Sequence, residues 1–340
     1  MISILRCQQC KGALEEKERY LHCDRCQKSY PIYKGLIFMG FDKKEKENIR
    51  TIMDTEKSHQ TDLNKIEEDL VYACQSFRLG KSAVNYLRSL TGRRSGLKVL
   101  EIGAGAGAMS WLLAENGFDL WLCEIEPNSL YSGFVYQHEN LSLGKRIVCD
   151  AKILPFDNAT FDVVFCKEFA HHIQNIDTLF GEVNRVLKNN GHLLLIEPIL
   201  SLFLKQYFFQ HPDQHHGHFY HSAREYFESF QANGFRIVKY GLYFYKEASH
   251  FPLIGRIKRR FNAEIRRGIR SFSDFFKYLY AAVVGGSMVV IAAKTKSPGT
   301  DKTSFVDIEI VPTSRLVLND DYLCKVEPFS VLLKRANEEP

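Results

Sequence analysis

The stretch Val99-Leu100-Glu101-Ile102-Gly103-Ala104-Gly105-Ala106-Gly107 decides the fold that we expect for this chain of 340 residues. A short strand-like run ends in three glycines at alternate positions, and the segment MSWLLAENG then follows with the apolar content of a helix. Glycine lets the backbone approach a ligand closely, and a helix N-terminus presents unpaired N–H groups. The stretch therefore predicts a strand, a ligand-binding turn and a helix.

The same glycines also satisfy the dinucleotide-binding pattern GxGxx[G/A], with Ala108 in the last place. Taken alone, the turn is a weak indication of which nucleotide cofactor binds. A nicotinamide-dependent dehydrogenase is therefore an alternative at this point.

Short apolar runs alternate with helical segments from Lys98 onward. The runs are KVLEIG, DLWLCEI, RIVCD, FDVVFCK, GHLLLIEP, FRIVKYGLYFY and SMVVIAAK. This alternation is typical of a parallel sheet covered by helices on both faces. Glu124 and Asp150 follow the second and third runs, at the carboxyl ends of strands, where open α/β sheets bind their ligands.

The succession from the glycine turn through LPF, FDVVF, HHI and RVLKNNG closely resembles the class I S-adenosylmethionine-dependent methyltransferases. The resemblance covers residues 96–200 strongly and 220–296 by architecture. It implies an α/β, Rossmann-like fold with a mostly parallel seven-stranded sheet, in which FRIVKYGLYFY and SMVVIAAK supply the final antiparallel hairpin. It also implies S-adenosyl-L-methionine as the cofactor.

Roles for individual residues follow from the resemblance by position. It implies that the methionine part of the cofactor is held by Glu101, Gly103 and Gly105, with Ala104 between the two glycines. It implies that Glu124, followed by Ile125, binds the ribose, that Asp150 faces the adenine amino group, and that Ala151 donates its backbone N–H to the adenine ring. It also implies that Lys167 begins the loop near the methyl group that is transferred. The chain departs from the family pattern at Glu101, where Asp is commoner, and at Ala104 and Ala106, where polar residues are frequent.

A sulfonium is already an activated methyl donor, so a base is needed only for a hydroxyl or a protonated amine acceptor. The candidates for that base are His171, His172, Glu168 and His218, with His221 further on. For His171 and His172 we favour the alternative, a structural role in a loop-to-helix turn. For the histidine-rich segment HPDQHHGHFYH we favour a solvated lid over a metal site, because its histidines lack regular ligand spacing.

Two missing motifs limit the acceptor. The fourth strand ends in Cys166-Lys167-Glu168-Phe169, which is neither the [N/D]-P-P-[Y/F] of amine methyltransferases acting on adenine or glutamine nor the Pro-Cys of cytosine enzymes. Cys166 is therefore expected to be a buried thiol. We expect an oxygen acceptor on a small molecule, a glycan or a lipid-carrier-linked compound. An RNA methyltransferase is the first alternative, and a non-catalytic cofactor-binding scaffold is the second.

Four cysteines form two CxxC pairs in the first 26 residues: Cys7, Cys10, Cys23 and Cys26. This spacing fits a tetrahedral structural zinc site with no open ligand position. Residues 1–40 also resemble the small zinc-ribbon family that activates tRNA, rRNA and protein methyltransferases, and both cysteine pairs and the YPI-x-x-G-L tail carry that resemblance. The sequence therefore predicts an N-terminal zinc ribbon with structural Zn²⁺.

The remaining segments complete a division into 1–40, a charged linker and helical lead-in over 41–95, the methyltransferase domain over 96–296 and a tail over 297–340. An aromatic and basic insert spans 201–280, and 254–279 reads as an amphipathic basic helix for which a pocket roof, a membrane surface and RNA are alternatives. The net charge of +5 does not by itself indicate a polyanionic partner. With no signal pattern and unpaired cysteines, a cytoplasmic protein is expected, with the inner membrane face as a peripheral contact. The oligomeric state stays open.

Overall fold

The computed structural model of the chain describes ten stretches. They are residues 2–40, 84–85, 87–89, 91–92, 96–105, 107–132, 144–199, 218–243, 286–295 and 309–310. The expected basic helix over 254–279, most of the aromatic insert, nearly all of the linker and most of the tail lie outside them. Within these stretches, no helix is long and apolar enough to cross a membrane.

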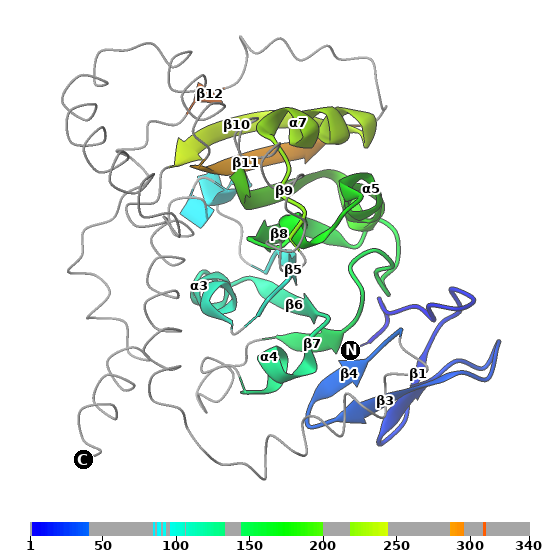
Figure 1. The fold of residues 1–340 in the computed structure, drawn as a ribbon. Helices are drawn as coiled ribbons and strands as arrows, with labels where there is room; N and C mark the ends of the chain where they lie inside the picture. The colour runs from blue at the N-terminus through cyan, green and yellow to red at the C-terminus, as the bar shows by residue number, and fades with distance from the viewer. Residues whose placement is uncertain are drawn as a thin grey trace, which may run out of the picture.

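One sheet runs through the whole described structure (Figure 1), in the order β1-β2-β3-β4-β7-β6-β5-β8-β9-β11-β10-β12. Its N-terminal strands are β1 (Glu15–Glu16), β2 (Tyr20–His22), β3 (Ser29–Tyr33) and β4 (Leu36–Phe38). Its central strands are β5 (Lys98–Ile102), β6 (Asp119–Glu124), β7 (Lys145–Val148), β8 (Phe161–Lys167) and β9 (Leu187–Ile199). The last strands are β10 (Phe235–Tyr243), β11 (Gly286–Lys294) and β12 (Glu309–Ile310).

The centre of the sheet is parallel, as expected. Strands β7, β6, β5, β8 and β9 are neighbours that run in one direction, and β11 lies antiparallel between β9 and β10. The expected antiparallel pair formed by FRIVKYGLYFY and SMVVIAAK is confirmed.

The expected number of seven strands was wrong, because the sheet has twelve. The seven strands from β5 to β11 form its middle. Parallel pairing of β4 with β7 adds the four N-terminal strands at one edge, with Ile37 opposite Ile147. At the other edge β12 pairs with β10, with Ile310 opposite Tyr240. The β4–β7 and β10–β12 pairings each join segments that are far apart in sequence, so no local sequence pattern predicts them.

Helices cover both faces of the sheet, as expected. They are α3 (Ala108–Glu115), α4 (Pro127–Ser132), α5 (Ile176–Val186) and α7 (Ala223–Ala232), with a 3₁₀ turn η1 (Ala170–His172) after β8. Successive residues of β5 point to opposite faces. Val99 joins the core that holds Leu112 of α3, whereas Leu100 joins the core that holds Phe180 of α5. The two cores therefore lie on opposite sides of one sheet, with residues of α5 and α7 in one and residues of α3 and α4 in the other.

The helices of the second face begin at well-formed N-caps. The Asn175 side chain accepts the N–H of Asp177 at the start of α5. Ser222 and Glu225 form a capping box at the start of α7. These caps fix where the loops that carry η1 and His218 meet the sheet.

Candidate cofactor and acceptor site

A cavity of about 170 Å³ opens at the carboxyl ends of β5, β6 and β7. It is lined by Ile102, Gly103, Cys123, Glu124, Ile125, Cys149, Asp150, Ala151, Lys152, Phe169, His172 and Ile173. The structure therefore gathers Gly103, Glu124, Ile125, Asp150 and Ala151, all expected from the sequence to contact a cofactor. The expected residues Glu101, Ala104, Gly105 and Lys167 do not line it.

The glycine turn brings the backbone against this cavity. Gly103 has a φ of 72°, a left-handed conformation that favours glycine. A Cβ at this position would lie 2.5–2.7 Å from three atoms of the Phe169 side chain. Only glycine therefore fits between β5 and the Phe169 ring.

Glu124 ends β6 with its carboxylate held by backbone groups. Oε1 accepts the N–H of Ile125 at 2.7 Å and of Glu126 at 3.2 Å, and Oε2 accepts the N–H of Gly105 at 3.2 Å. Burial raises the pKa of Glu124, and these backbone hydrogen bonds lower it. A carboxylate oxygen has two lone pairs, so a carboxylate fixed in this way can still accept a ligand hydroxyl.

Glu101 lies beneath the turn. Its side chain is almost fully buried and accepts a hydrogen bond from the Ser110 hydroxyl at 2.6 Å. Burial raises the pKa of Glu101 to about 8, against the lowering effect of Ser110 and the Lys167 ammonium. Lys167, also buried, forms an ion pair with Glu168 at 2.8 Å. Glu101 and Lys167 therefore lie outside the cavity and support the loops that line it.

Asp150 begins the loop on the other side of the cavity. Its Oδ1 accepts the N–H of Lys152 at 2.9 Å, and its Oδ2 lies 3.3 Å from the Lys152 ammonium. Lys152 thus forms a short turn around the Asp150 carboxylate, with Ala151 buried between them.

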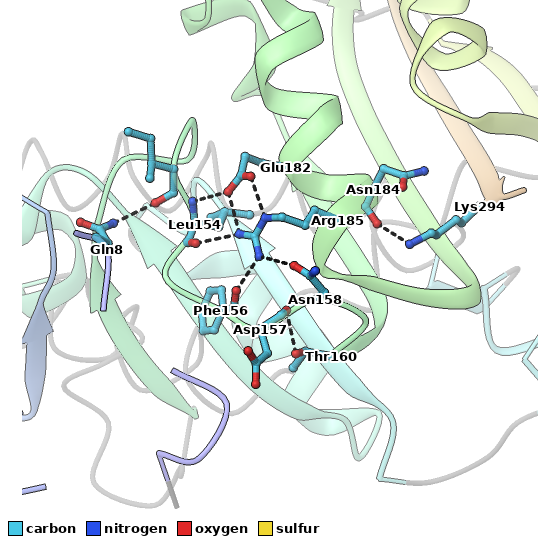
Figure 2. A network of polar contacts seen from close by, with 11 residues as sticks. Gln8, Leu154, Phe156, Asp157, Asn158, Thr160, Glu182, Asn184, Arg185 and Lys294 are labelled. Atoms are coloured by element: carbon cyan, nitrogen blue, oxygen red, sulfur yellow. Dashed lines mark hydrogen bonds and ion pairs between the residues drawn. The ribbon is translucent and has the colours of Figure 1, made fainter. Parts of the chain in front are cut away.

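Arg185 of α5 fixes the loop that continues from Asp150 (Figure 2). Its guanidinium binds both carboxylate oxygens of Glu182 at 2.7 Å and donates to the carbonyl oxygens of Leu154 at 2.8 Å and Phe156 at 2.6 Å. Glu182 also accepts the N–H of Leu154 at 2.7 Å. The sequence analysis missed this network, because Arg185 and Glu182 look like an ordinary helical ion pair.

The segment that precedes β1 contacts the same loop. The Gln8 side chain donates to the Ile153 carbonyl at 2.8 Å (Figure 2), and the N–H of Arg6 donates to the Pro155 carbonyl at 2.9 Å. Asp157 donates its N–H to the Ile4 carbonyl at 2.9 Å. The loop that begins at Asp150 and Ala151 is thus held between α5 and the N-terminal segment.

Three of the histidines expected near the acceptor come together after β8. The rings of His171, His172 and His218 have centroid separations of 4.3, 4.5 and 5.0 Å. Of these, His172 lines the cavity. Burial, with smaller effects of His171 and His218, lowers the pKa of His172 to about 4, so this ring is neutral at pH 7. His221 does not join the group, because it is buried with its Nε2 at 2.9 Å from the Ile173 carbonyl oxygen.

Glu197 on β9 organises this group, and the sequence analysis missed it. Its fully buried carboxylate accepts the N–H groups of Phe169 and Ala170 at 2.6 Å through Oε1. Its Oε2 lies 2.9 Å from His171 Nδ1. The only sequence signal is one acid at the end of an otherwise apolar strand, LLLIEP.

Cys166 lies near the end of β8, and Glu168 follows the strand. Cys166 is buried, and burial raises its pKa well above the usual thiol value, which agrees with the expected unreactive strand thiol. Glu168 has a φ of 49°, an uncommon left-handed conformation for a non-glycine residue at the point where the chain turns into η1.

The four N-terminal cysteines form a compact cluster. One sulfur from each lies within 4.8 Å of the others, with Cys7 and Cys26 at 3.5 Å and Cys10 and Cys23 at 3.4 Å. Four thiolates on one tetrahedral zinc ion lie about 3.8 Å apart, given a Zn–S bond of about 2.3 Å. The spacing of the sulfurs therefore fits such an ion.

The two CxxC turns share one backbone pattern. The carbonyl of Cys7 accepts the N–H of Lys11, and the carbonyl of Cys23 accepts the N–H of Gln27, both at 2.8 Å. Lys11 and Gln27 both have a left-handed φ, of 58° and 62°. Such paired turns aim all four sulfurs at one point. A Cβ at Gly12 would lie 3.2 Å from the sulfurs of both Cys10 and Cys23, so the backbone passes directly against the cluster.

Comparison with known proteins bears on the central strands. Residues 100–195 match the family described as a methyltransferase domain. This segment holds the glycine turn, Glu124, Asp150 and η1. This part of the chain is therefore similar to a methyltransferase domain. The match favours the methyltransferase interpretation of the glycine turn over the dehydrogenase.

Curated relatives agree with the domain match. The ubiquinone/menaquinone biosynthesis C-methyltransferase UbiE of Bordetella parapertussis is 31% identical over 126 residues, which are 36% of this chain and 45% of the relative. Its counterpart in Shewanella sp. strain ANA-3 is 27% identical over 135 residues, 38% of this chain and 53% of the relative. The chain thus spans about half the length of the curated relatives that it matches.

A solved structure is also similar. The phosphoethanolamine N-methyltransferase 2 of Haemonchus contortus, in complex with S-adenosyl-L-methionine, matches with a TM-score of 0.43 and 20% identity over 63% of this chain and 52% of that chain. The domain match and the curated relatives are thus both to methyltransferases. None of these matches tests the roles of single residues or the N-terminal zinc ribbon.

Proposed function

We propose that this chain transfers a methyl group from S-adenosyl-L-methionine and that the cofactor binds in the cavity between Gly103, Glu124 and Asp150. The observation that carries the proposal is that these three residues, far apart in sequence, line one cavity at the carboxyl ends of three adjacent parallel strands. The methyltransferase-domain match covers the same strands.

Each side of the cavity suits one part of the cofactor. Glycine at position 103 lets the Phe169 ring pack against the turn, and the wall formed in this way is the one along which the methionine part lies. The fixed carboxylate of Glu124 accepts the ribose hydroxyls, in charge-assisted hydrogen bonds. Asp150 accepts a hydrogen bond from the adenine amino group, and Ala151 donates its backbone N–H to the adenine ring. Glu101 and Lys167 act from outside the cavity by holding the turn and the β8 end.

The bound cofactor supplies an activated methyl on its sulfonium sulfur. The chain's residues then have to hold the acceptor in line with that methyl and exclude water. A hydroxyl acceptor would take the methyl on its oxygen, and its proton would pass to solvent water. The neutral His172 ring at the cavity wall, backed by His171, His218 and Glu197, is the polar group beside which the acceptor lies. Glu168 is less suited because Lys167 already pairs with it.

For the acceptor we propose an oxygen atom on a small molecule, a glycan or a lipid-carrier-linked compound. The absence of the planar-amine and cytosine motifs after β8 supports it. Carbon is the second candidate atom, because the curated relatives are named C-methyltransferases. RNA and membrane contact were alternatives to a pocket roof for residues 254–279, which lie outside the described residues.

Isotope labelling tests the proposal. The full chain is incubated with S-adenosyl-L-methionine carrying a labelled methyl and an extract of the organism that makes it, and the extract is then divided into lipid, RNA, protein and small-molecule fractions. We expect label in the lipid or small-molecule fraction, dependent on Glu124. Label in RNA would overturn the acceptor class, and equal labelling by Glu124→Ala would overturn the site.

We also propose that Cys7, Cys10, Cys23 and Cys26 hold one structural zinc ion. Sulfur spacing, the two matched turns and the close approach of Gly12 support it. The buried Tyr30 hydroxyl accepts the N–H of Gln8 at 3.0 Å and lies 3.2 Å from the Cys7 sulfur, to which it can donate. Such outer contacts orient ligands in metal sites. Four thiolates leave the ion no open position, so its role is to fold residues 1–40.

A further inference from the structure

The histidine cluster beside the cavity has the composition of a second metal site. One ring nitrogen from each of His171, His172 and His218 lies within 4.8 Å of the other two. We propose that these three histidines bind one divalent transition-metal ion of the zinc class, with a coordination position left for an oxygen ligand. Imidazole is a preferred ligand of such ions, and three protein ligands with one open position are typical of catalytic zinc sites.

Glu197 provides the outer contact that histidine ligands usually have. Its carboxylate is fully buried and is held in place by the N–H groups of Phe169 and Ala170. Because a carboxylate only accepts, the contact at 2.9 Å requires His171 to donate from Nδ1. The lone pair of His171 is then on Nε2, which is the arrangement of carboxylate–histidine–metal sites.

The third ligand is positioned by Tyr220. The Tyr220 hydroxyl lies 3.0 Å from His218 Nδ1, and its ring stacks on His171 at an interplanar angle of 3°. The loop is tied to η1 by its backbone as well, since the N–H of Phe219 donates to the His171 carbonyl at 2.5 Å. His218 thus lies against η1 although it is distant in sequence.

Only a small rearrangement would complete the site. Nitrogens that share a tetrahedral zinc ion lie about 3.4 Å apart, given Zn–N bonds of about 2.0–2.1 Å. The three nitrogens all lie within 4.8 Å of one another, so the rings have to close by at most about 1.4 Å. His172 is the most exposed of the three, and rotation of its ring can supply much of that movement.

The place of the site suggests what the open position binds. His172 lines the cavity that we assign to the cofactor, so an ion on this cluster would lie beside the acceptor. A metal ion lowers the pKa of a bound hydroxyl and holds its oxygen in place. The role in acceptor binding rests on the proposed function, whereas metal binding itself does not.

Cobalt titration of the full chain tests the inference. The protein is first loaded with one equivalent of Zn²⁺ to fill the cysteine cluster and is then titrated with Co²⁺ by calorimetry and visible absorption. We expect one Co²⁺ per chain, with the weak d–d bands of nitrogen and oxygen ligands and no thiolate charge-transfer band. The variants His172→Ala and His218→Ala should each bind at least about tenfold more weakly, and Glu197→Gln about 10–100-fold more weakly. His192→Ala, on β9 outside the cluster, should bind like the wild type.

Three results would overturn the inference: no Co²⁺ uptake by the zinc-loaded chain, unchanged uptake in both His172→Ala and His218→Ala, or cobalt bound through thiolates. Binding of S-adenosyl-L-methionine is measured on the same samples. Cofactor binding without Co²⁺ uptake would overturn only the metal site, and Co²⁺ uptake without cofactor binding would overturn only the proposed function.

Discussion

The ring of Phe169, after β8, lies so close to the backbone of Gly103, after β5, that no side chain fits between them. This contact sets one wall of the cavity. We expect Gly103→Ala to push the ring away and to weaken S-adenosyl-L-methionine binding at least about tenfold. Calorimetry measures the loss.

Gly117 provides a matched control for this substitution. Its φ of 74° is nearly that of Gly103, but nothing lies within 4 Å of its missing Cβ. Both alanine variants therefore carry a similar backbone strain, of about 1–3 kcal/mol, and only Gly103→Ala adds the clash. Equal cofactor affinity in the two variants would contradict this account of the turn.

Glu101 should make stability depend on pH. Its pKa is about 8 in the folded chain and near 4.5 when exposed, so the folded state holds an extra proton between these values. Stability contributed by this site therefore falls as the pH rises from about 4.5 to about 8. Relative to wild type, Glu101→Gln should gain on the order of 3 kcal/mol between pH 5 and pH 8, measured by urea unfolding. A difference that is the same at both pH values would refute it.

Arg185 should matter far more than a surface arginine. Arg185→Ala leaves the Glu182 carboxylate and two loop carbonyls without their partner, which we expect to cost about 2–3 kcal/mol of unfolding free energy and to weaken cofactor binding. Arg224→Ala removes an exposed pair with Glu228 on α7 and should cost at most about 0.5 kcal/mol. Thermal unfolding compares the two, and similar losses would show that the network does not hold the loop.

In chains that carry His172→Ala, which disables the proposed histidine site, the cysteine cluster predicts one zinc ion per chain by elemental analysis. Cys7→Ser and Cys23→Ser should lose it, whereas Cys166→Ala, which changes a buried thiol on β8, should keep it. Gly12→Ala should retain zinc with reduced affinity, because its Cβ crowds two of the sulfurs. Full zinc content in Cys7→Ser would rule out the proposed ligand set.

The sequence predicted those features that local patterns encode. Alternating apolar runs located every strand from β5 to β11, and acids at the ends of two strands located Glu124 and Asp150 in one cavity. The meeting of the two acids follows from a rule of topology, because parallel strands bring their carboxyl ends to one edge of the sheet.

The features that were missed depend on contacts between distant segments. Glu197 lies on β9 and His171 lies on η1, which follows β8, so the β8–β9 pairing brings them together. The joining of β4 to β7 depends on backbone groups, which every residue has, so no side-chain pattern reveals it. The family resemblance places Glu101 at the cofactor, and in the structure its side chain is buried and accepts a hydrogen bond from Ser110, a contact that the sequence does not reveal.

Calorimetric titration with S-adenosyl-L-methionine tests the central claim most directly. The wild type should bind it, Glu124→Ala should bind it more weakly by about 1–3 kcal/mol through loss of charge-assisted hydrogen bonds, and the adjacent exposed variant Glu126→Ala should match the wild type. Tight binding of a nicotinamide dinucleotide by the wild type, with no binding of S-adenosyl-L-methionine, would contradict the account.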